Sequence, residues 1–143
     1  MKVLISDKMD ARCVEILQEN PGVEVDVQTG LDEAGLIDII GEYDALIVRS
    51  GTQVTPPVLE AAHRLKVVGR AGAGVDNIDT AAATRGGVIV MNTPGGNSVS
   101  TAEHSFAMIM SLARNIPQGT ASLKDGRWER SQLTGVELRG KTI

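Results

Sequence analysis

Aromatic residues are almost absent from this chain, in which one Trp, one Tyr and one Phe make up 2% of the 143 residues. The core must therefore be aliphatic, and the 42% of hydrophobic residues suits a parallel sheet flanked by helices. The single cysteine, Cys13, excludes an internal disulfide and CxxC metal sites. A lone reduced thiol is consistent with a cytoplasmic location.

Long apolar runs are also missing, because no run approaches the ~20 residues that span a bilayer. The sequence has no recognisable signal peptide. The net charge is −4 with both signs interspersed, which argues against a nucleic-acid surface. We therefore expect neither membrane nor nucleic acid as a partner. A small anionic ligand is compatible with this charge, because a few local arginines are enough to bind it.

Short apolar runs alternate with helical patterns over residues 1–97. This alternation predicts an α/β fold with a parallel sheet and helices on both faces. Thr55, just before Pro56, is expected to cap one of the helices. The expected strands lie at residues 2–6, 23–27, 45–48, 66–69 and 88–91.

A second unit is expected over residues 98–143. Ser100 and Glu103 match a capping box, which predicts a helix over 100–116 with an apolar stripe. The segment after it holds the only Trp among many charges and cannot form a core alone. The sequence from Lys141 to Ile143 has the pattern of the first half of a buried strand.

Glycine, arginine and amide side chains follow three of the predicted strands. The carboxyl ends of parallel strands meet at one edge of a sheet, which is where ligands bind in such folds. Arg49 and Ser50 follow the third strand, where a forked guanidinium could bind a carboxylate or phosphate. The alternative for Arg49 is an ion pair with a neighbouring acid.

A glycine turn follows the fourth strand, with Arg70 at its entrance. Gly72 and Gly74 permit positive φ and a close approach of backbone N–H groups to an anion. The alternative is a tight turn that binds nothing. The dinucleotide fingerprint G-x-G-x-x-G would need a glycine at position 77, where Asn77 stands.

No catalytic residue and no metal-binding cluster is predicted in the chain. Glu103 and His104 are adjacent on a helix, so their side chains do not face each other. Cys13 has no nearby cation or histidine to activate it. The residues alone thus predict an anion-binding site without a general base.

Several stretches resemble the amino-terminal part of the D-isomer-specific 2-hydroxyacid dehydrogenases. The segments at 95–98 and 124–128 are similar to the branch of this family that acts on 3-phosphoglycerate. The stretches that carry the resemblance are 48–50, 68–79, 91–98, 102–103, 121–128 and 137–142.

The resemblance implies a flavodoxin-like substrate-binding domain followed by the start of a Rossmann domain that binds NAD. It implies that Ala73 lies beside both substrate and cofactor. The other residues that it assigns to the substrate acid are Arg49, Ser50, Arg70, Gly72, Gly74 and Asn97.

The resemblance further implies a homo-oligomeric oxidoreductase at the first step of L-serine biosynthesis, in which the Trp128 segment packs on a partner subunit. In the family, the G-x-G-x-x-G loop and the catalytic Arg, Glu and His come later in the chain. We therefore expect residues 1–143 alone to be inactive.

Other interpretations remain open at this point. Another member of the family could act on glyoxylate, lactate or formate. A non-catalytic flavodoxin-like binding module would share the same fold. A phosphoacceptor signalling module would need acids after the first strand and an Asp after the third, where Ser6-Asp7-Lys8 offers one acid and Arg49 replaces the Asp.

Overall fold

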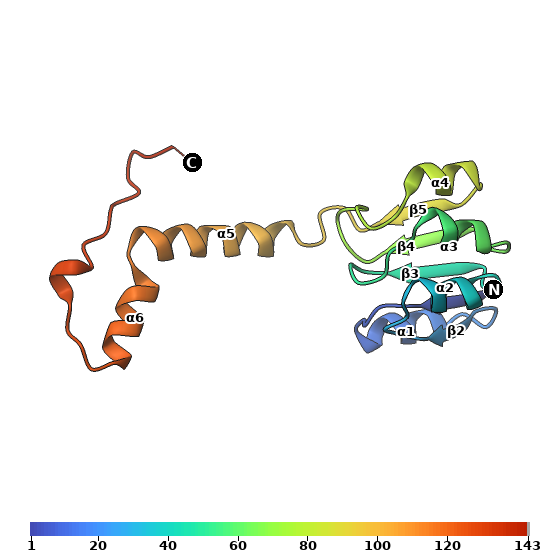
Figure 1. Ribbon diagram of the computed structural model, residues 1–143, viewed down its shortest axis with the longest axis horizontal. Helices are drawn as coiled ribbons and strands as arrows, with labels where there is room; N and C mark the ends of the chain where they lie inside the picture. Colours follow the sequence, from blue (N-terminus) through green and yellow to red (C-terminus); the bar gives the residue numbers. More distant parts are fainter. Residues whose placement is uncertain (143) are drawn as a thin grey trace. The chain divides into compact units, whose positions relative to one another are not determined.

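The computed structural model describes residues 1–142 and divides into two compact units, with the division between Gly96 and Asn97 (Figure 1). The assignment of these units as substrate-binding and cofactor-binding parts stays a prediction. Among the described helices, none is long and apolar enough to cross a membrane.

The first unit is built on a five-stranded parallel sheet in the order β2-β1-β3-β4-β5. This is the strand order of flavodoxin-like folds. The chain places β2 on one side of β1 and the later strands on the other side, so the topological switch point lies between β1 and β3. The strand β2, which is half-exposed, lies at the edge of the sheet, as its alternating sequence pattern predicts. The strands are β1 (Lys2–Ile5), β2 (Glu24–Val27), β3 (Ala45–Val48), β4 (Val67–Arg70) and β5 (Ile89–Asn92).

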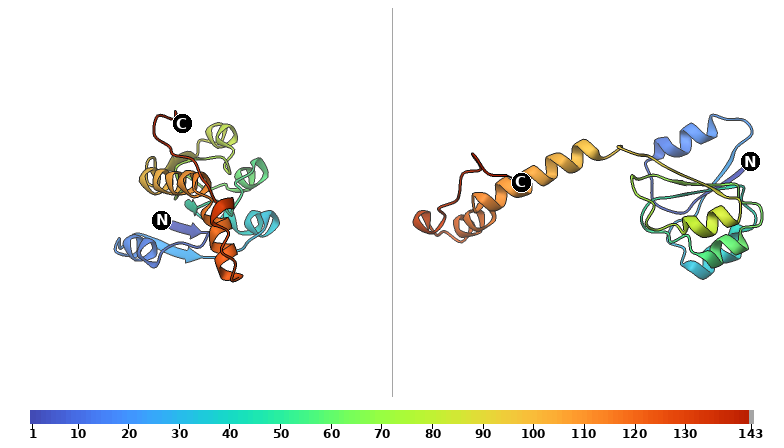
Figure 2. Two further views of the ribbon diagram at one scale, coloured as in Figure 1. Left: turned by 90° about the vertical axis from the view of Figure 1, so that its left-hand side faces the viewer. Right: turned by 90° about the horizontal axis from the view of Figure 1, so that it is seen from above.

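Helices cover both faces of this sheet, which confirms the predicted α/β layering. Figure 2 shows α1 on one face and the other three helices together on the opposite face. The helices are α1 (Ala11–Gln18), α2 (Glu33–Ile40), α3 (Pro56–Ala61) and α4 (Thr80–Arg85).

Aspartates begin three of these helices by accepting backbone N–H groups, at Asp10, Asp32 and Asp79. The expected cap at α3 is wrong: Thr55 stands at the N-cap position, but its side chain caps nothing. Its hydroxyl donates instead to the carboxylate of Glu33 at the start of α2. The helix still begins there, because Pro56 supplies the required φ.

The core lies between the sheet and the face covered by α2, α3 and α4. It is aliphatic, as the composition requires, and Tyr43 is its one aromatic member among the described residues. The buried side chains of the sheet and of these helices include Leu4, Leu46, Val48, Val68, Leu36, Ile40, Val58 and Ala83.

The second unit contains α5 (Ser98–Ala113), α6 (Ile116–Lys124) and the 3-10 helix η1 (Arg130–Gln132). The predicted capping box is wrong, because α5 begins two residues earlier and Ser100 donates to the carbonyl of Asn97. The predicted helix over 100–116 is found as α5, which ends at Ala113, three residues before the predicted end. Asn115, with a left-handed φ of 52°, separates it from α6. Pro117 lies in the first turn of α6, where its missing N–H costs nothing.

The strand predicted from Lys141 is not formed by the described residues, since Lys141 and Thr142 are outside any strand. Ile143 lies outside the described residues.

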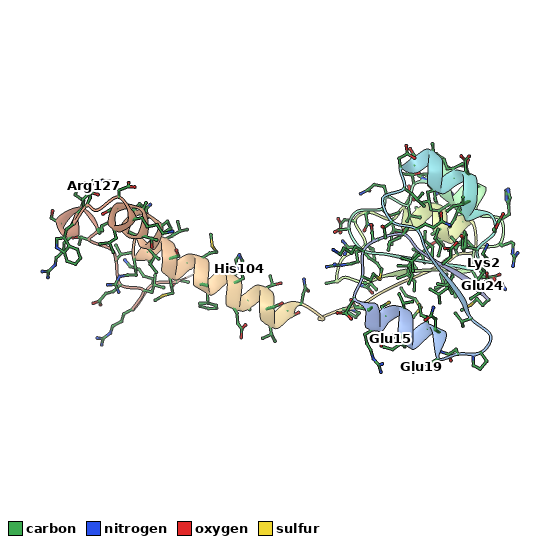
Figure 3. The ribbon with its side chains drawn as sticks, turned by 90° about the horizontal axis from the view of Figure 1, so that it is seen from below. Lys2, Glu15, Glu19, Glu24, His104 and Arg127 are labelled. Atoms are coloured by element: carbon green, nitrogen blue, oxygen red, sulfur yellow. The ribbon has the colours of Figure 1, made fainter. Side chains whose placement is uncertain are left out.

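A polar cluster occupies the amino end of the sheet, where β1 and β2 begin with Lys2 beside Glu24 (Figure 3). Tyr43, 2% exposed, donates a hydrogen bond of 2.5 Å to Asp26. The ammonium of Lys2 lies 4.6 Å from the centre of the Tyr43 ring. The hydroxyl of Tyr43, together with Gln28, lowers the pKa of Asp26, and burial with the Asp26 bond raises the pKa of Tyr43 to about 12.

We expect the Tyr43 hydroxyl to titrate near pH 12 in the folded chain. Tyr43 is the only tyrosine, so tyrosinate absorbance in the near ultraviolet reports this pKa directly. Because the folded pKa lies above the ordinary value of 10.0, the stabilisation is complete below pH 10 and is lost as the pH rises towards 12.

The control is Tyr43→Phe, which lacks the hydroxyl and keeps the ring. Its free energy of unfolding should fall below that of the unmodified chain by about 1 kcal/mol at neutral pH. This difference should shrink between pH 10 and 12. A tyrosinate transition at pH 10 in the folded chain would contradict the assignment.

Candidate functional site

The loop after β3 is held by an aspartate from the end of β1. The Asp7 carboxylate accepts the N–H of Arg49 at 2.6 Å and the N–H of Thr52 at 3.1 Å. It also accepts the Thr52 hydroxyl at 3.1 Å. The Thr52 hydroxyl proton goes to Asp7, so the buried Ser6 hydroxyl, 2.9 Å from Thr52, is the donor in that pair.

Two carbonyl groups of the same loop accept hydrogen bonds from side chains at the end of β4 and in the segment after it. The side-chain amide of Asn77 donates to the carbonyls of Arg49 at 2.9 Å and Thr52 at 2.6 Å. Nε of Arg70 donates to the Arg49 carbonyl at 3.1 Å. Both strand-end segments therefore form one hydrogen-bonded unit. Asn77 is 5% exposed, and its Oδ1 has no partner within residues 1–142.

The glycine turn is shaped by the side chain of Arg70. The expected positive φ at Gly72 and Gly74 is wrong, since neither has one. Glycine is needed there for space: a Cβ on Gly72 would lie 2.8 Å from Nη1 of Arg70. That nitrogen donates to the Gly74 carbonyl at 2.7 Å, and the guanidinium also pairs with Asp76 at 3.3 Å.

Several backbone N–H groups of the two segments are left available. In the described part of the chain, no hydrogen bond is found from the N–H groups of Ser50, Gly51, Ala73 and Gly74. The first pair follows β3 and the second pair follows β4, which are adjacent parallel strands. Exposed backbone donors at one edge of a sheet can bind an anion.

The guanidinium of Arg49 pairs with no acid among residues 1–142. It is exposed and makes one long contact of 3.5 Å, with the carbonyl of Lys8. Within residues 1–142, the ion pair that was the alternative for Arg49 is not formed. Arg70, whose side chain is 11% exposed, does pair with an acid, Asp76.

The end of β5 completes this edge of the sheet. The Asn92 side chain donates to the Ala73 carbonyl at 2.7 Å, and the Thr93 N–H donates to the Gly72 carbonyl at 3.0 Å. An open, largely apolar pocket of about 260 Å³ lies beside it, lined by residues from the ends of β3, β4 and β5. They are Ile47, Gly69, Arg70, Ala71, Met91, Asn92 and Thr93.

Two residues named from the sequence lie in the second unit. Asn97 stands at the N-cap position of α5 without a side-chain cap bond. His104 is exposed on α5, as Figure 3 shows, and makes no side-chain hydrogen bond with a described residue.

The sequence alone does not predict that Asp7 and Asn77 hold the loop after β3. It points to Asp7 only as one acid of an incomplete phosphoacceptor cluster, and to Asn77 only as the residue that interrupts a glycine pattern. The available signal was position, because Asp7 follows β1, the sheet neighbour of β3. A polar residue there can reach the loop after β3 across the sheet edge.

A family model described as "D-isomer specific 2-hydroxyacid dehydrogenase, catalytic domain" matches residues 3–131. The chain belongs to this family. The resemblance expected from the motifs is thereby confirmed, and the family is one of oxidoreductases.

Curated relatives in the 2-hydroxyacid dehydrogenase family include two D-3-phosphoglycerate dehydrogenases. The protein from Homo sapiens is 56% identical over 142 residues, which cover 99% of this chain and 26% of that protein. The protein from Synechocystis is 51% identical over 142 residues, 99% of this chain and 25% of that protein. The chain thus spans about a quarter of the length of these relatives.

Solved structures give the same fold. The TT0316 protein of Thermus thermophilus matches with a TM-score of 0.86 and 31% identity over 98% of this chain and 46% of that one. The NAD⁺-bound 3-phosphoglycerate dehydrogenase of Entamoeba histolytica matches with a TM-score of 0.71 and 31% identity. That match covers 80% of this chain and 39% of the other.

We expect Gly72→Ala to displace the Arg70 guanidinium in this 2-hydroxyacid dehydrogenase chain. The new Cβ would occupy space 2.8 Å from Nη1, so the bond to the Gly74 carbonyl would break. Loss of that charge-assisted bond should lower the free energy of unfolding by about 1–3 kcal/mol, measured with urea.

The matched control is Gly22→Ala, because a Cβ on Gly22 meets nothing within 4 Å. That variant should stay within about 0.5 kcal/mol of the unmodified chain. Equal losses in the two variants would contradict the steric argument.

Proposed function

We propose that this chain is the substrate-binding region of an NAD-dependent D-3-phosphoglycerate dehydrogenase, an enzyme of the first step of L-serine biosynthesis. The observation that carries the proposal is the unpaired Arg49 guanidinium beside available backbone N–H groups, at the carboxyl edge of the sheet. The identity of 56% to a D-3-phosphoglycerate dehydrogenase supports the choice of substrate.

Arg49 is the group best suited to bind an anion directly. A guanidinium presents paired N–H donors that match a carboxylate or a phosphate. Ser50 adds a hydroxyl and an N–H, and Ala73 and Gly74 add the available amides of the second segment. The Gly72 N–H donates to the Arg70 carbonyl at 2.9 Å, so Gly72 takes part through its position in the turn. A molecule that bears both a carboxylate and a phosphate, as 3-phosphoglycerate does, could use both sets of donors.

Arg70 and Asn97 take different parts in this proposal. The three contacts of Arg70 with Arg49, Gly74 and Asp76 support a role in which it orders the two segments. The resemblance also implies a contact between Arg70 and the substrate, and this contact remains part of the proposal. Asn97, which makes no side-chain cap bond, retains an amide able to bind substrate.

NAD would accept the hydride from C2 of the substrate. Within this chain, Ala73 is the residue that we place next to the cofactor, since it is exposed and its N–H is unused within residues 1–142. The sequence contains no G-x-G-x-x-G to hold the pyrophosphate. These 143 residues would therefore hold and orient the acid, which lowers the entropic part of the barrier. Expressed alone, they should show no turnover.

A homo-oligomer and a cytoplasmic location are part of the same proposal. Trp128 is 79% exposed and lines a pocket of about 350 Å³ in the second unit, with Leu123 and Leu133. An exposed aromatic beside an apolar pocket is typical of subunit contacts. The single free thiol of Cys13 is compatible with a reducing compartment.

The first test is a panel of acids offered with NAD to the protein that contains this chain. We expect 3-phosphoglycerate to be oxidised with the highest kcat/KM. A preference for lactate, glycerate or formate would contradict the choice of substrate and favour another member of the family.

In the same assay, Arg49→Gln should raise the KM for the acid roughly 10- to 150-fold, because a charged hydrogen bond contributes about 1.5–3 kcal/mol. The KM for NAD should be unchanged. The control is Arg85→Gln, which removes an exposed arginine at the end of α4 and should change neither constant.

We expect Trp128→Ala to weaken subunit association, measured by sedimentation over a range of concentrations. Loss of an aromatic anchor costs about 2 kcal/mol or more, which is roughly a 30-fold rise in the dissociation constant. Ile16→Ala removes an exposed apolar side chain from the first unit and should leave association unchanged. A monomeric unmodified protein would contradict the proposed oligomer.

A further inference from the structure

We propose that Asp7 is a positioning residue for the substrate anion, because its carboxylate fixes the loop from Arg49 to Thr52 and so directs the Arg49 guanidinium. This inference rests on the proposed function, since it concerns the same site. Asp7 does not touch the reacting atoms in this proposal. It acts through Arg49.

The contacts of Asp7 fix both ends of the loop. Its carboxylate binds the N–H of Arg49 at 2.6 Å and the N–H of Thr52 at 3.1 Å, across 42 and 45 residues of sequence. The two residues between are left exposed with unused N–H groups in the described chain. The carboxylate thus binds the N–H groups at the two ends of the loop and leaves those of Ser50 and Gly51 for a ligand.

Gly51 shows how closely the loop follows the carboxylate. A Cβ on Gly51 would lie 2.6 Å from Oδ1 of Asp7, which is closer than real Cβ contacts. A side chain at position 51 would therefore push the carboxylate away from its donors. The present hydrogen bonds between the loop and Asp7 therefore depend on glycine at this position.

The segment that carries Asp7 also reaches the Arg49 side chain. The carbonyl of Lys8 lies 3.5 Å from Nη1 of Arg49. The turn after β1 thus contacts Arg49 through its N–H and through its guanidinium. A shift of this turn would move both the backbone and the direction of the binding group.

The charge of Asp7 alone would oppose binding of an anion. The carboxylate oxygens accept the N–H groups of Arg49 and Thr52 and the Thr52 hydroxyl. These donors of the loop partly offset the negative charge of the carboxylate. A net effect in favour of substrate must therefore come from geometry. This reasoning distinguishes positioning from charge in an experiment.

The test uses the protein that contains this chain and measures steady-state kinetics for Asp7→Asn with 3-phosphoglycerate. The amide has one acceptor oxygen where the carboxylate has two, so it cannot accept from the Arg49 N–H, the Thr52 N–H and the Thr52 hydroxyl as the carboxylate does, and the hydrogen bonds that fix the loop weaken. We expect the KM for the acid to rise roughly tenfold or more, because a displacement of ~1 Å in a binding group can cost about 100-fold. The KM for NAD should not change.

Coupling to Arg49 separates positioning from general destabilisation. In an Arg49→Gln background, Asp7→Asn should have almost no further effect on kcat/KM, since its action passes through Arg49. Gly51→Ala keeps the Asp7 charge, displaces the carboxylate, and should raise the KM in the same way. It also serves as the second variant if Asp7→Asn does not fold.

Asp38→Asn is the control for loss of one negative charge, because Asp38 is exposed on α2 and makes no hydrogen bond through its side chain to a described residue. Its kinetic constants should equal those of the unmodified protein. Additive effects of Asp7→Asn and Arg49→Gln would overturn the positioning role. So would an unchanged KM in Gly51→Ala.

Failure of the proposed function looks different from failure of this inference. An unmodified protein that oxidises none of the acids overturns both. An unmodified protein that prefers another acid overturns only the choice of 3-phosphoglycerate, and the same variants are then measured with the preferred acid. Turnover with additive variants overturns only the role of Asp7.

Discussion

The backbone N–H and carbonyl groups of the loop after β3 need hydrogen-bond partners. The side chains that supply these partners determine most of the geometry of the site. Buried or half-buried N–H and carbonyl groups are costly when unpaired. Here a carboxylate from the turn after β1 binds the N–H groups at both ends of the loop. The Asn77 amide binds the carbonyls at the same two ends. The loop is thereby fixed between two polar side chains.

The same arrangement explains why the two arginines differ. Arg70 belongs to β4 and turns back towards the loop, where the carbonyls of Arg49 and Gly74 and the Asp76 carboxylate satisfy three of its nitrogens. Arg49 is the first residue after β3. The nearby carboxylate of Asp7 accepts backbone N–H groups of the loop, and the Arg49 guanidinium pairs with no acid among residues 1–142. Arg70 therefore stabilises this edge of the sheet, and the Arg49 guanidinium stays available.

Much of the first unit could be predicted from the sequence. Apolar runs of four residues, separated by helices with aspartate caps, specify a parallel sheet and its edge strand. The predicted strand ends do meet at one edge, because the carboxyl ends of parallel strands must. The family could be named from motifs that include those around Arg70 and Asn92, and the family model matches residues 3–131.

Several of the errors share one physical cause, which is that patterns of residue type do not reveal which side chains meet in the folded chain. Gly72 lacks a side chain because Arg70 occupies the space, and not because of its φ. Thr55 gives its hydroxyl to Glu33 on another helix instead of capping its own. Asp7 binds partners more than forty residues away. Each of these needs the fold before it can be seen.

The two ends of the sheet are satisfied in opposite ways, and this argues for where a ligand binds. At the amino end, Asp44 accepts the Lys2 N–H at 2.8 Å and pairs with Arg64 and Lys66, while Tyr43 binds Asp26. These contacts hold the pKa of Asp44 and of Asp26 below the ordinary value, as expected for acids that are already paired.

At the carboxyl end, several donors lack a partner within residues 1–142, and one buried acceptor, Oδ1 of Asn77, lacks one as well. The Asp7 oxygens and the carbonyls of Arg49 and Thr52 are bound, whereas the Arg49 guanidinium pairs with no acid, and the N–H groups of Ser50 and Ala73 make no hydrogen bond within these residues. A surface with donors in excess recruits an acceptor from solution, and an anion supplies the strongest one. The asymmetry between the two ends therefore predicts both the place and the sign of the ligand before any substrate is named.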